Sequence, residues 1–268
     1  MVIHMEENNT MRAAQRLFAL LETLARQGAM GVTELAAATQ LNKATVFRLV
    51  NTLAALGYVR QEESGKYRLT YKLLGVAGRL LEQNDFQTLV RPYLERLAAR
   101  TGETVHLVQR EDDHIVYIDK VEPTVNSIRM VSRVGMAQPL YCTAVGKALL
   151  AGDSRREAHE IWNRSKVRVL TPHTISRWED FENELRQVCR LGYATDMEEN
   201  EIGVRCVAVA LPDYSGRCRH AVSISAPVSR MTDKRLPQIA AQLLAFRSEF
   251  IREWESGPLQ TGGTMEKN

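Results

Sequence analysis

Apolar residues recur at helical spacing in three stretches near the N-terminus. The first stretch begins at Met11 and ends at Gly28. The second is short and follows Thr33, whose hydroxyl we expect to cap it; the third follows its expected N-cap, Asn42, and ends at Gly57. Two helices joined by so short a turn are typical of a helix-turn-helix.

Two short strands are predicted after the third helix, over residues 58–61 and 66–69. Gly65 lies in the turn between them and supplies the positive φ that a tight hairpin needs. We therefore expect a winged helix-turn-helix domain over residues 11–70, a layout that places its third helix in the major groove of DNA. Residues 1–10 lack such a pattern, and we expect them to be disordered.

A further helix is predicted over residues 71–85, and it is apolar on more than one face. Such a helix needs a partner. We interpret it as a linker helix that also contributes to dimer contacts, and the alternative is that it packs only against its own domain.

The remaining chain, residues 86–255, mixes helices and strands without strict alternation, which favours an α+β domain with a largely antiparallel sheet. Helices are predicted over 86–100, from Thr143, and over 178–191 and 232–255; strands are predicted over 104–109, 115–121, 128–132, 204–211 and 220–226. Turns are expected at 112–113 and 213–216, and residues 256–268 are expected to be disordered.

Composition narrows the class of protein. The 268 residues are enough for two domains, and the 44% hydrophobic and 25% charged residues are typical of a soluble globular chain. No apolar run approaches the roughly 20 residues that cross a bilayer. The N-terminus lacks the basic segment and apolar core of a secretory signal, so we expect a cytoplasmic protein without a membrane partner.

The net charge of +3 is too small to indicate a nucleic-acid partner by itself. The local distribution of charge is more informative, because residues 40–69 contain five basic residues and only two acidic ones. The basic residues are Lys43, Arg48, Arg60, Lys66 and Arg68, and the acidic ones are Glu62 and Glu63. Such a face fits phosphate contacts, although a solvated helix face is the alternative.

The four cysteines show no Cys-x-x-Cys pair and no histidine at zinc-finger distance. They are Cys142, Cys189, Cys206 and Cys218. We expect them to be reduced and buried as small apolar side chains, with no metal and no cofactor.

Catalysis has little support in the sequence. Candidate nucleophiles exist, but there is no Gly-x-Ser-x-Gly elbow, His-Glu-x-x-His motif, phosphate-binding loop or Gly-x-Gly-x-x-Gly fingerprint. The acidic run 196–201 fits a metal site or a base, but such a run is more typical of a solvated turn. We therefore do not expect an enzyme.

A ligand site has better support. Small residues at the helix start 143–147 leave backbone N–H groups for an anion, and Lys147 either reinforces that site or is an exposed helix charge. Ser223 and Ser225 alternate with apolar residues, so they share one face of a strand and suit a small polar ligand. The alternative is that a helix covers the two serines and the backbone accepts their hydrogen bonds.

Six blocks together resemble the IclR family of bacterial transcriptional regulators, from about Met11 to Glu255. They are 41–49 with 56–59, then 67–70, 139–147, 192–201, 203–209 and 221–227. The resemblance implies a GAF-like effector-binding domain behind the winged helix. It also implies homodimers, often paired into tetramers as dimers of dimers, on palindromic operators.

The resemblance also implies an effector pocket between the 143–147 loop and the sheet. Carried over by position, and with Gly146 of the same loop, its residues are Met130, Ala144, Val145, Gly146, Asp196, Val204, Cys206, Ser223 and Ser225. Some members have Gly-Ala where this chain has Ala144-Val145, and the bulkier pair narrows that wall.

The leading prediction is a DNA-binding regulator whose operator affinity is set by a small organic acid, with the polar pocket favouring a hydroxylated one such as a sugar acid. The residues expected at double-stranded DNA are Thr33, Asn42, Lys43, Ala44, Thr45, Arg48, Lys66 and Arg68. One alternative is a small-carboxylate enzyme using Cys206, Asp196 and a serine, with the N-terminal domain serving only in dimerisation. Another is a winged helix that binds protein.

Overall fold

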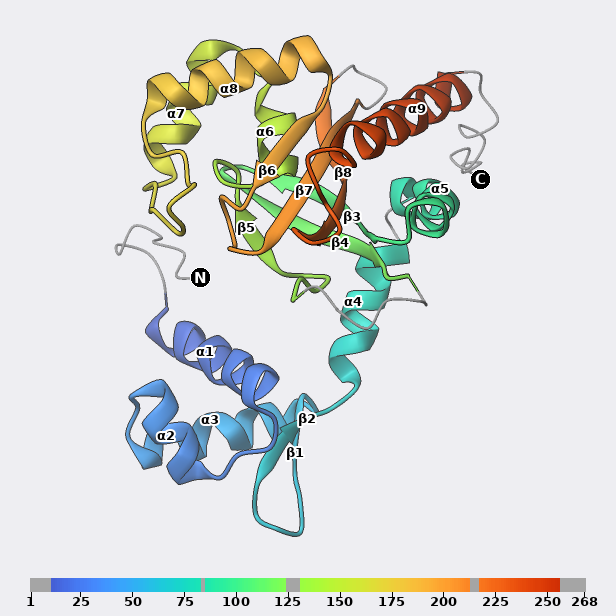
Figure 1. Cartoon of the computed structure of the whole chain (residues 1–268). Helices are drawn as coiled ribbons and strands as arrows, with labels where there is room; N and C mark the ends of the chain where they lie inside the picture. Colours follow the sequence, from blue (N-terminus) through green and yellow to red (C-terminus); the bar gives the residue numbers. More distant parts are fainter. Residues whose placement is uncertain (1–10, 83–84, 124–130, 213–216, 256–268) are drawn as a thin grey trace, which may run out of the picture. The chain divides into compact units, whose positions relative to one another are not determined.

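The computed structural model describes residues 11–82, 85–123, 131–212 and 217–255 of the chain (Figure 1). These residues belong to two compact units, Met1–Asn84 and Asp85–Asn268. No helix in the described ranges has the length and hydropathy to span a bilayer.

The first unit is a winged helix-turn-helix, as predicted (Figure 1). Its elements are α1 (Arg12–Gln27), α2 (Val32–Thr39), α3 (Lys43–Ala55), β1 (Val59–Gln61), β2 (Tyr67–Leu69) and α4 (Lys72–Glu82). The strands β1 and β2 pair antiparallel, and Gly65 in the turn between them has a φ of 77°, which confirms the expected hairpin.

Of the two side chains expected to cap helices, Asn42 does so and Thr33 does not. Asn42 caps α3, because its Oδ1 accepts a hydrogen bond from the Thr45 amide at 2.7 Å. The prediction that Thr33 caps α2 is wrong: the helix begins one residue earlier, and Gly31 is the N-cap. The Gly31 amide donates to the Glu34 carboxylate at 2.7 Å, so an acidic side chain in the first turn satisfies the amide of the N-cap residue.

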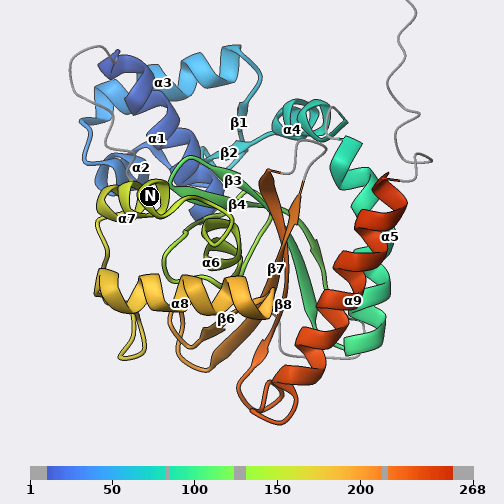
Figure 2. The same ribbon diagram turned by 90° about the horizontal axis from the view of Figure 1, so that it is seen from above.

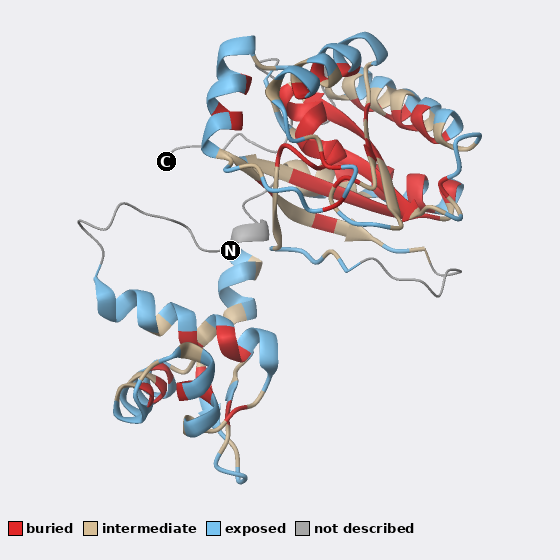
Figure 3. Cartoon of the chain, turned by 60° about the vertical axis from the view of Figure 1, so that its left-hand side comes forward, coloured by how far each residue is buried: buried red, intermediate tan, exposed pale blue. Residues whose placement is uncertain are grey.

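One small core holds the first unit together. Leu20 of α1, Leu35 of α2, and Val46 and Val50 of α3 are fully buried and belong to one cluster. Figure 3 shows buried positions along the helices of this unit. Leu49 of α3 is half-buried at the edge of this core. The opposite side of α3 is left exposed, so helical periodicity alone decides which residues of α3 face outwards.

The second unit is an α+β domain with a six-stranded antiparallel sheet in the order β5-β4-β3-β8-β7-β6. The strands are β3 (Thr104–Glu111), β4 (His114–Val121), β5 (Ala137–Pro139), β6 (Ala194–Met197), β7 (Val204–Pro212) and β8 (Cys218–Pro227). The helices are α5 (Asp85–Thr101), α6 (Ala144–Leu150), α7 (Arg155–Arg164), α8 (Trp178–Leu191) and α9 (Leu236–Glu255).

Helices cover both faces of this sheet (Figure 2). On one face α5 and α9 bury apolar residues that include Leu107, Val222 and Ile224. On the other face α6 lies against the strands, with α7 and α8 outside it (Figure 2). Alternation along β8 therefore sends Val222 and Ile224 into one core, while Ser223 and Ser225 face the α6 side.

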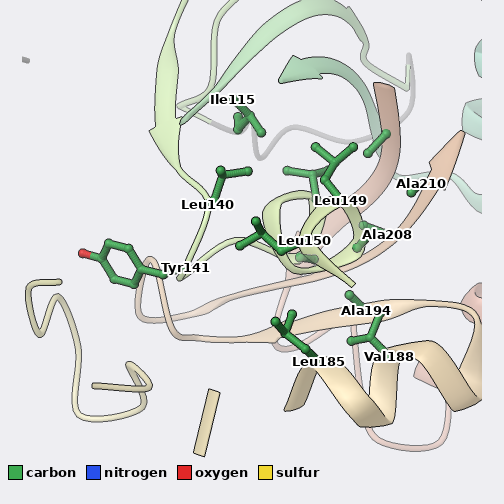
Figure 4. Packing of buried hydrophobic residues seen from close by; sticks show 14 of the residues in the cluster. Ile115, Leu140, Tyr141, Leu149, Leu150, Leu185, Val188, Ala194, Ala208 and Ala210 are labelled. Atoms are coloured by element: carbon green, nitrogen blue, oxygen red, sulfur yellow. The ribbon is translucent and has the colours of Figure 1, made fainter. Parts of the chain in front are cut away.

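Every residue of α6 is buried. Leu149 and Leu150 lie at the centre of the core on this side, between Ile115 and Leu140 on one hand and Leu185 on the other (Figure 4). A helix buried all round is held at a fixed position relative to the sheet. The start of α6 therefore forms a rigid wall.

Several elements differ from the sequence-based expectations. The predicted strand 128–132 falls largely outside the described residues, and Val131 and Ser132 are not in a strand. The elements α7, β5 and β6 were not predicted, and α9 begins at Leu236 instead of residue 232. The expected turn at 213–216 and the expected disorder of 1–10 and 256–268 also lie outside the described residues. The turn at 112–113 is present, with Asp112 at a φ of 48°.

Candidate functional site

The exposed side of α3 carries two basic side chains. Lys43 and Arg48 are exposed, as is Ala44 between them, while Thr45 is half-buried. Among the described residues neither Lys43 nor Arg48 has an ion-pair partner, whereas Lys66 and Arg68 of the wing each have one. These two cations are therefore available to an outside anion. Asn42 uses its Oδ1 on the helix cap, which leaves its amide nitrogen available as a donor.

The basic residues of the wing are paired. Lys66 Nζ lies 3.3 Å from Glu34 Oε1, and Arg68 Nη1 lies 3.2 Å from Glu62 Oε1. Their side chains are 32–51% exposed, so water screens both ion pairs and each is weak. Phosphates can replace the two carboxylates at little cost. Thr33 is exposed in the first turn of α2.

The second candidate site is a cavity of about 100 Å³ between the start of α6 and the α6 face of the sheet. Seven of the nine residues expected in a ligand pocket line it: Ala144, Val145, Asp196, Val204, Cys206, Ser223 and Ser225. Met130 lies outside the described residues. The cavity also includes residues that were not predicted, namely His106, Tyr117, Val131, Ser132, Met136, Gln138, Thr143, Asn200 and Glu201.

Gly146 does not line the cavity, contrary to expectation. A Cβ built on Gly146 would lie 2.1 Å from the carbonyl oxygen of Leu140, so the glycine allows α6 to approach the preceding backbone closely. The Gly146 amide is also unavailable to a ligand, because it donates to the Thr143 hydroxyl at 3.1 Å. The amides of Ala144 and Val145 have no acceptor within the described part of the chain, and both residues lie at the cavity wall.

Strand register explains why the polar residues meet. Asp196 of β6 lies opposite Cys206 of β7, which lies opposite Ser225 of β8. Ser223 of β8 lies opposite His106 of β3. Residues directly opposite in a sheet point to the same face, so these side chains form two adjacent rows across the cavity floor.

Asp196 is almost fully buried, which contradicts the interpretation of the run 196–201 as a solvated turn. Its Oδ1 accepts hydrogen bonds from the amides of Glu199 at 2.7 Å and Asn200 at 3.4 Å. Burial, followed by the charge of Glu199, raises the pKa of Asp196 to about 7. Asp196 therefore changes its protonation state near neutral pH.

Lys147 is neither an exposed helix charge nor a cavity residue. It is fully buried, and its Nζ lies 2.5 Å from Glu199 Oε1 and 3.0 Å from Glu184 Oε1. Burial opposes its charge, but the two carboxylates outweigh burial and raise its pKa. The ammonium thus ties α6 to α8 and to the loop that follows Asp196, and it is already neutralised.

His106 and Tyr117 are the main cavity residues that sequence reasoning missed. His106 is buried, its Nε2 lies 2.7 Å from Ser132 Oγ, and its Nδ1 lies 3.4 Å from Ser225 Oγ. Burial, followed by the charge of Lys120, lowers the pKa of His106 to about 3, so the ring is neutral. The pairing of β3 with β8 places His106 beside Ser223, and neither strand shows this pairing in its own sequence.

The cysteines are all free. Cys206 accepts a hydrogen bond from Ser225 Oγ at 3.1 Å, and burial raises the pKa of its thiol. Cys142 is buried, but Cys189 is exposed, so the expectation that all four are buried is wrong. Within the described ranges no three His, Cys, Asp or Glu side chains are grouped to hold a metal ion.

Comparison with known proteins places both units in one family. Residues 13–63 match the model of the IclR helix-turn-helix domain. Residues 78–250 match the model described as bacterial transcriptional regulator IclR C-terminal.

Curated relatives match along most of their length. The chain is 37% identical over 239 residues to the HTH-type transcriptional regulator KdgR of Escherichia coli, covering 89% of this chain and 90% of the relative. It is 31% identical over 234 residues to the transcriptional repressor IclR of the same organism, covering 86% of this chain and 85% of that one.

Solved structures share the fold. The IclR structure from Thermotoga maritima superposes with a TM-score of 0.78 at 32% identity, covering 91% of this chain and 99% of that one. An IclR homolog from Microbacterium hydrocarbonoxydans complexed with 4-hydroxybenzoate has a TM-score of 0.77, covering 91% of this chain and 100% of that one. At 19% identity this second likeness concerns the fold alone.

Proposed function

The chain belongs to the IclR family of bacterial transcriptional regulators, and we propose that its affinity for operator DNA is set by a small organic acid bound in the cavity. The observation that carries this proposal is the combination of two unpaired cations on an exposed recognition helix with a buried polar cavity in a separate unit. Such a protein would act in the cytoplasm, where the DNA is.

The DNA contacts follow from the exposed side of α3. We assign Lys43, Ala44, Thr45 and Arg48 to the major groove, with Arg48 donating to a guanine, a contact that contributes about 1–3 kcal/mol of discrimination. Thr33, Asn42, Lys66 and Arg68 would contact the phosphate backbone. A single copy makes only a few base contacts, which give limited specificity. A palindromic operator read by two copies therefore fits this surface better than a single half-site.

Paired readers require a homodimer, and α4 together with Tyr71, the residue before it, supplies a surface for one. Tyr71, Leu74 and Val76 have exposed fractions of 82%, 64% and 56%. Apolar side chains this exposed favour a protein partner. We propose that a second copy covers them, alone or within a tetramer built from two dimers, and that effector binding alters the spacing of the two recognition helices. The acid can do so only by binding one spacing more tightly than the other.

The cavity suits a small hydroxylated acid. The unpaired amides of Ala144 and Val145 can donate to a carboxylate, while Asp196, Ser223 and Ser225 can bind hydroxyl groups. One water-sized atom needs about 10–15 Å³ of cavity volume. The cavity of about 100 Å³ therefore has room for roughly seven to ten non-hydrogen atoms. Polyhydroxylated acids of three or four carbons have this size.

The enzyme alternative is less consistent with the geometry. A cysteine nucleophile needs a thiol pKa below its ordinary value, whereas burial raises the pKa of Cys206. His106, the histidine in the cavity, contacts Ser225 and not the sulfur. The curated relatives are named as transcriptional regulators.

Two experiments test the proposal. A thermal-shift screen of hydroxylated, keto and aromatic acids should identify ligands, because binding to the native state raises its stability. A gel-shift assay should show weaker operator binding for Lys43→Ala and Arg48→Ala, but not for Arg177→Ala, which removes an exposed guanidinium from the second unit. Unchanged operator binding in both α3 variants would refute the assignment of the recognition helix.

A further inference from the structure

The cavity contains polar groups that have no hydrogen-bond partner among the described residues. The Tyr117 hydroxyl lines the cavity and makes no hydrogen bond to any described residue. The same holds for the Ser223 hydroxyl and for Oδ2 of Asp196. Partly enclosed polar atoms normally find hydrogen-bond partners, so three such atoms around one cavity indicate a ligand with several polar groups.

Tyr117 approaches the cavity from a strand well separated from that of Asp196. It lies on β4, whereas Asp196 lies on β6 at the far edge of the sheet, with β3, β8 and β7 between them in the strand order. Burial, followed by the charges of Cys206 and Asp196, raises the pKa of Tyr117, so its hydroxyl stays protonated and can donate. A ligand that occupies the cavity can therefore meet a donor on one wall and the Asp196 carboxylate on another.

His106 fixes the orientation of the hydroxyls beside Tyr117. A neutral imidazole has one donor and one acceptor nitrogen. Ser225 donates its own hydrogen to Cys206 Sγ, so Nδ1–H of His106 donates to Ser225 Oγ, and Nε2 accepts from Ser132 Oγ at 2.7 Å. The Ser132 oxygen is then left as an acceptor at the cavity wall. The ring of His106 also contacts that of Tyr117, with centroids 5.0 Å apart.

We infer that Tyr117 and His106 determine which acids this protein accepts: Tyr117 donates a hydrogen bond to an alcohol group of the ligand, and His106 aligns Ser132 to accept one. This inference rests on the proposed binding of a small acid in the cavity. The ligand class is an aliphatic hydroxy acid whose hydroxyl groups extend along the chain away from the carboxylate. An unsubstituted aliphatic acid would leave the Tyr117 and Ser132 groups unpaired, which is how such a site discriminates.

The test is isothermal titration calorimetry of the full-length protein with L-threonate and with butyrate, which have the same four-carbon chain and differ in their hydroxyl groups. Tyr117→Phe removes only the hydroxyl. We expect it to weaken threonate binding about tenfold and to leave butyrate binding within about twofold. His106→Gln should also weaken threonate more than butyrate. The melting temperature of Tyr117→Phe without ligand should not fall, because its hydroxyl has no partner in the described residues.

Tyr141→Phe is the matched control. The Tyr141 hydroxyl lies outside the cavity, donates to the Arg168 carbonyl at 3.1 Å and accepts from the Arg168 amide at 3.0 Å. Its removal should lower the melting temperature and leave the ratio of threonate to butyrate affinities unchanged. An unchanged ratio in Tyr117→Phe would overturn the inference alone. Failure of the wild-type protein to bind threonate, butyrate and the shorter glycerate would overturn the proposed effector class, and the inference with it.

Discussion

The carboxylate of Glu199 lies 2.5 Å from the ammonium of Lys147, and both residues are buried. The amide of the same Glu199 donates to Asp196. One ion pair therefore positions both the wall of the cavity at α6 and its acidic residue. This relationship predicts how the second unit responds to the loss of either partner.

Lys147→Met should destabilise the second unit by about 3–5 kcal/mol, because it leaves Glu199 buried without its cation. Lys147→Met combined with Glu199→Met should recover most of this loss, since an apolar pair replaces the ion pair in a dry site. Urea unfolding followed by circular dichroism measures both. A double variant as unstable as the single one would show that the charge of Glu199 is not the cause.

The stability of the protein should depend on the protonation of Asp196. Its pKa rises from an ordinary 3.8 to about 7 on folding, so between these values the folded state holds a proton that the unfolded state has released. This contribution to stability falls as the pH rises through that window and is constant above it. Asp196→Asn has no such dependence, so its melting temperature relative to wild type should increase from pH 5 to pH 8. Parallel curves for the two proteins would contradict the assigned pKa.

Gly146→Ala should destabilise the protein by about 1–3 kcal/mol or more, because the new Cβ meets the Leu140 carbonyl at 2.1 Å and α6 cannot move within a filled core. Gly152→Ala provides the control near the end of the same helix, since its nearest neighbour lies at 3.5 Å, an ordinary contact distance. Equal melting temperatures for the two variants would show that α6 shifts freely.

Leu74→Glu should weaken self-association. The side chain is 64% exposed, so the substitution has little effect on the isolated chain but places a charge on the proposed dimer surface. Light scattering after gel filtration should show wild-type particles of at least twice the 30.3 kDa chain mass, and smaller particles for the variant at low concentration. A variant of wild-type mass at all concentrations would exclude α4 from the interface.

Local chemistry made the first unit predictable. Asn42 at the start of α3 and Gly65 in the wing act through the backbone within a few residues, so their roles can be read from the sequence. Thr33 was misassigned because Gly31 and Glu34 provide a competing start for α2. The helix α7 also has a signal in the sequence, because Ser154 and Glu157 form a capping box at its start.

The cavity was only partly predictable, for a different reason. Alternation along β8 was enough to place Ser223 and Ser225 on one face. The positions of His106 and Tyr117 depend on how β3, β4 and β8 pair, which residue types alone do not reveal. The short strands β5 and β6 depend on pairing with β4 and β7 in the same way. Lys147 gave no local sign of burial, because its partners Glu184 and Glu199 are 37 and 52 residues away.

The regulator proposal is tested most directly by the fluorescence anisotropy of an operator duplex selected by the full-length protein from a randomised pool. It is measured with and without the hydroxy acid that gives the largest thermal shift. We predict that the acid changes operator affinity at least tenfold for the wild-type protein and much less for Ser223→Ala. An operator affinity that the acid leaves unchanged, although calorimetry shows that it binds, would contradict the proposed coupling between the cavity and the recognition helix.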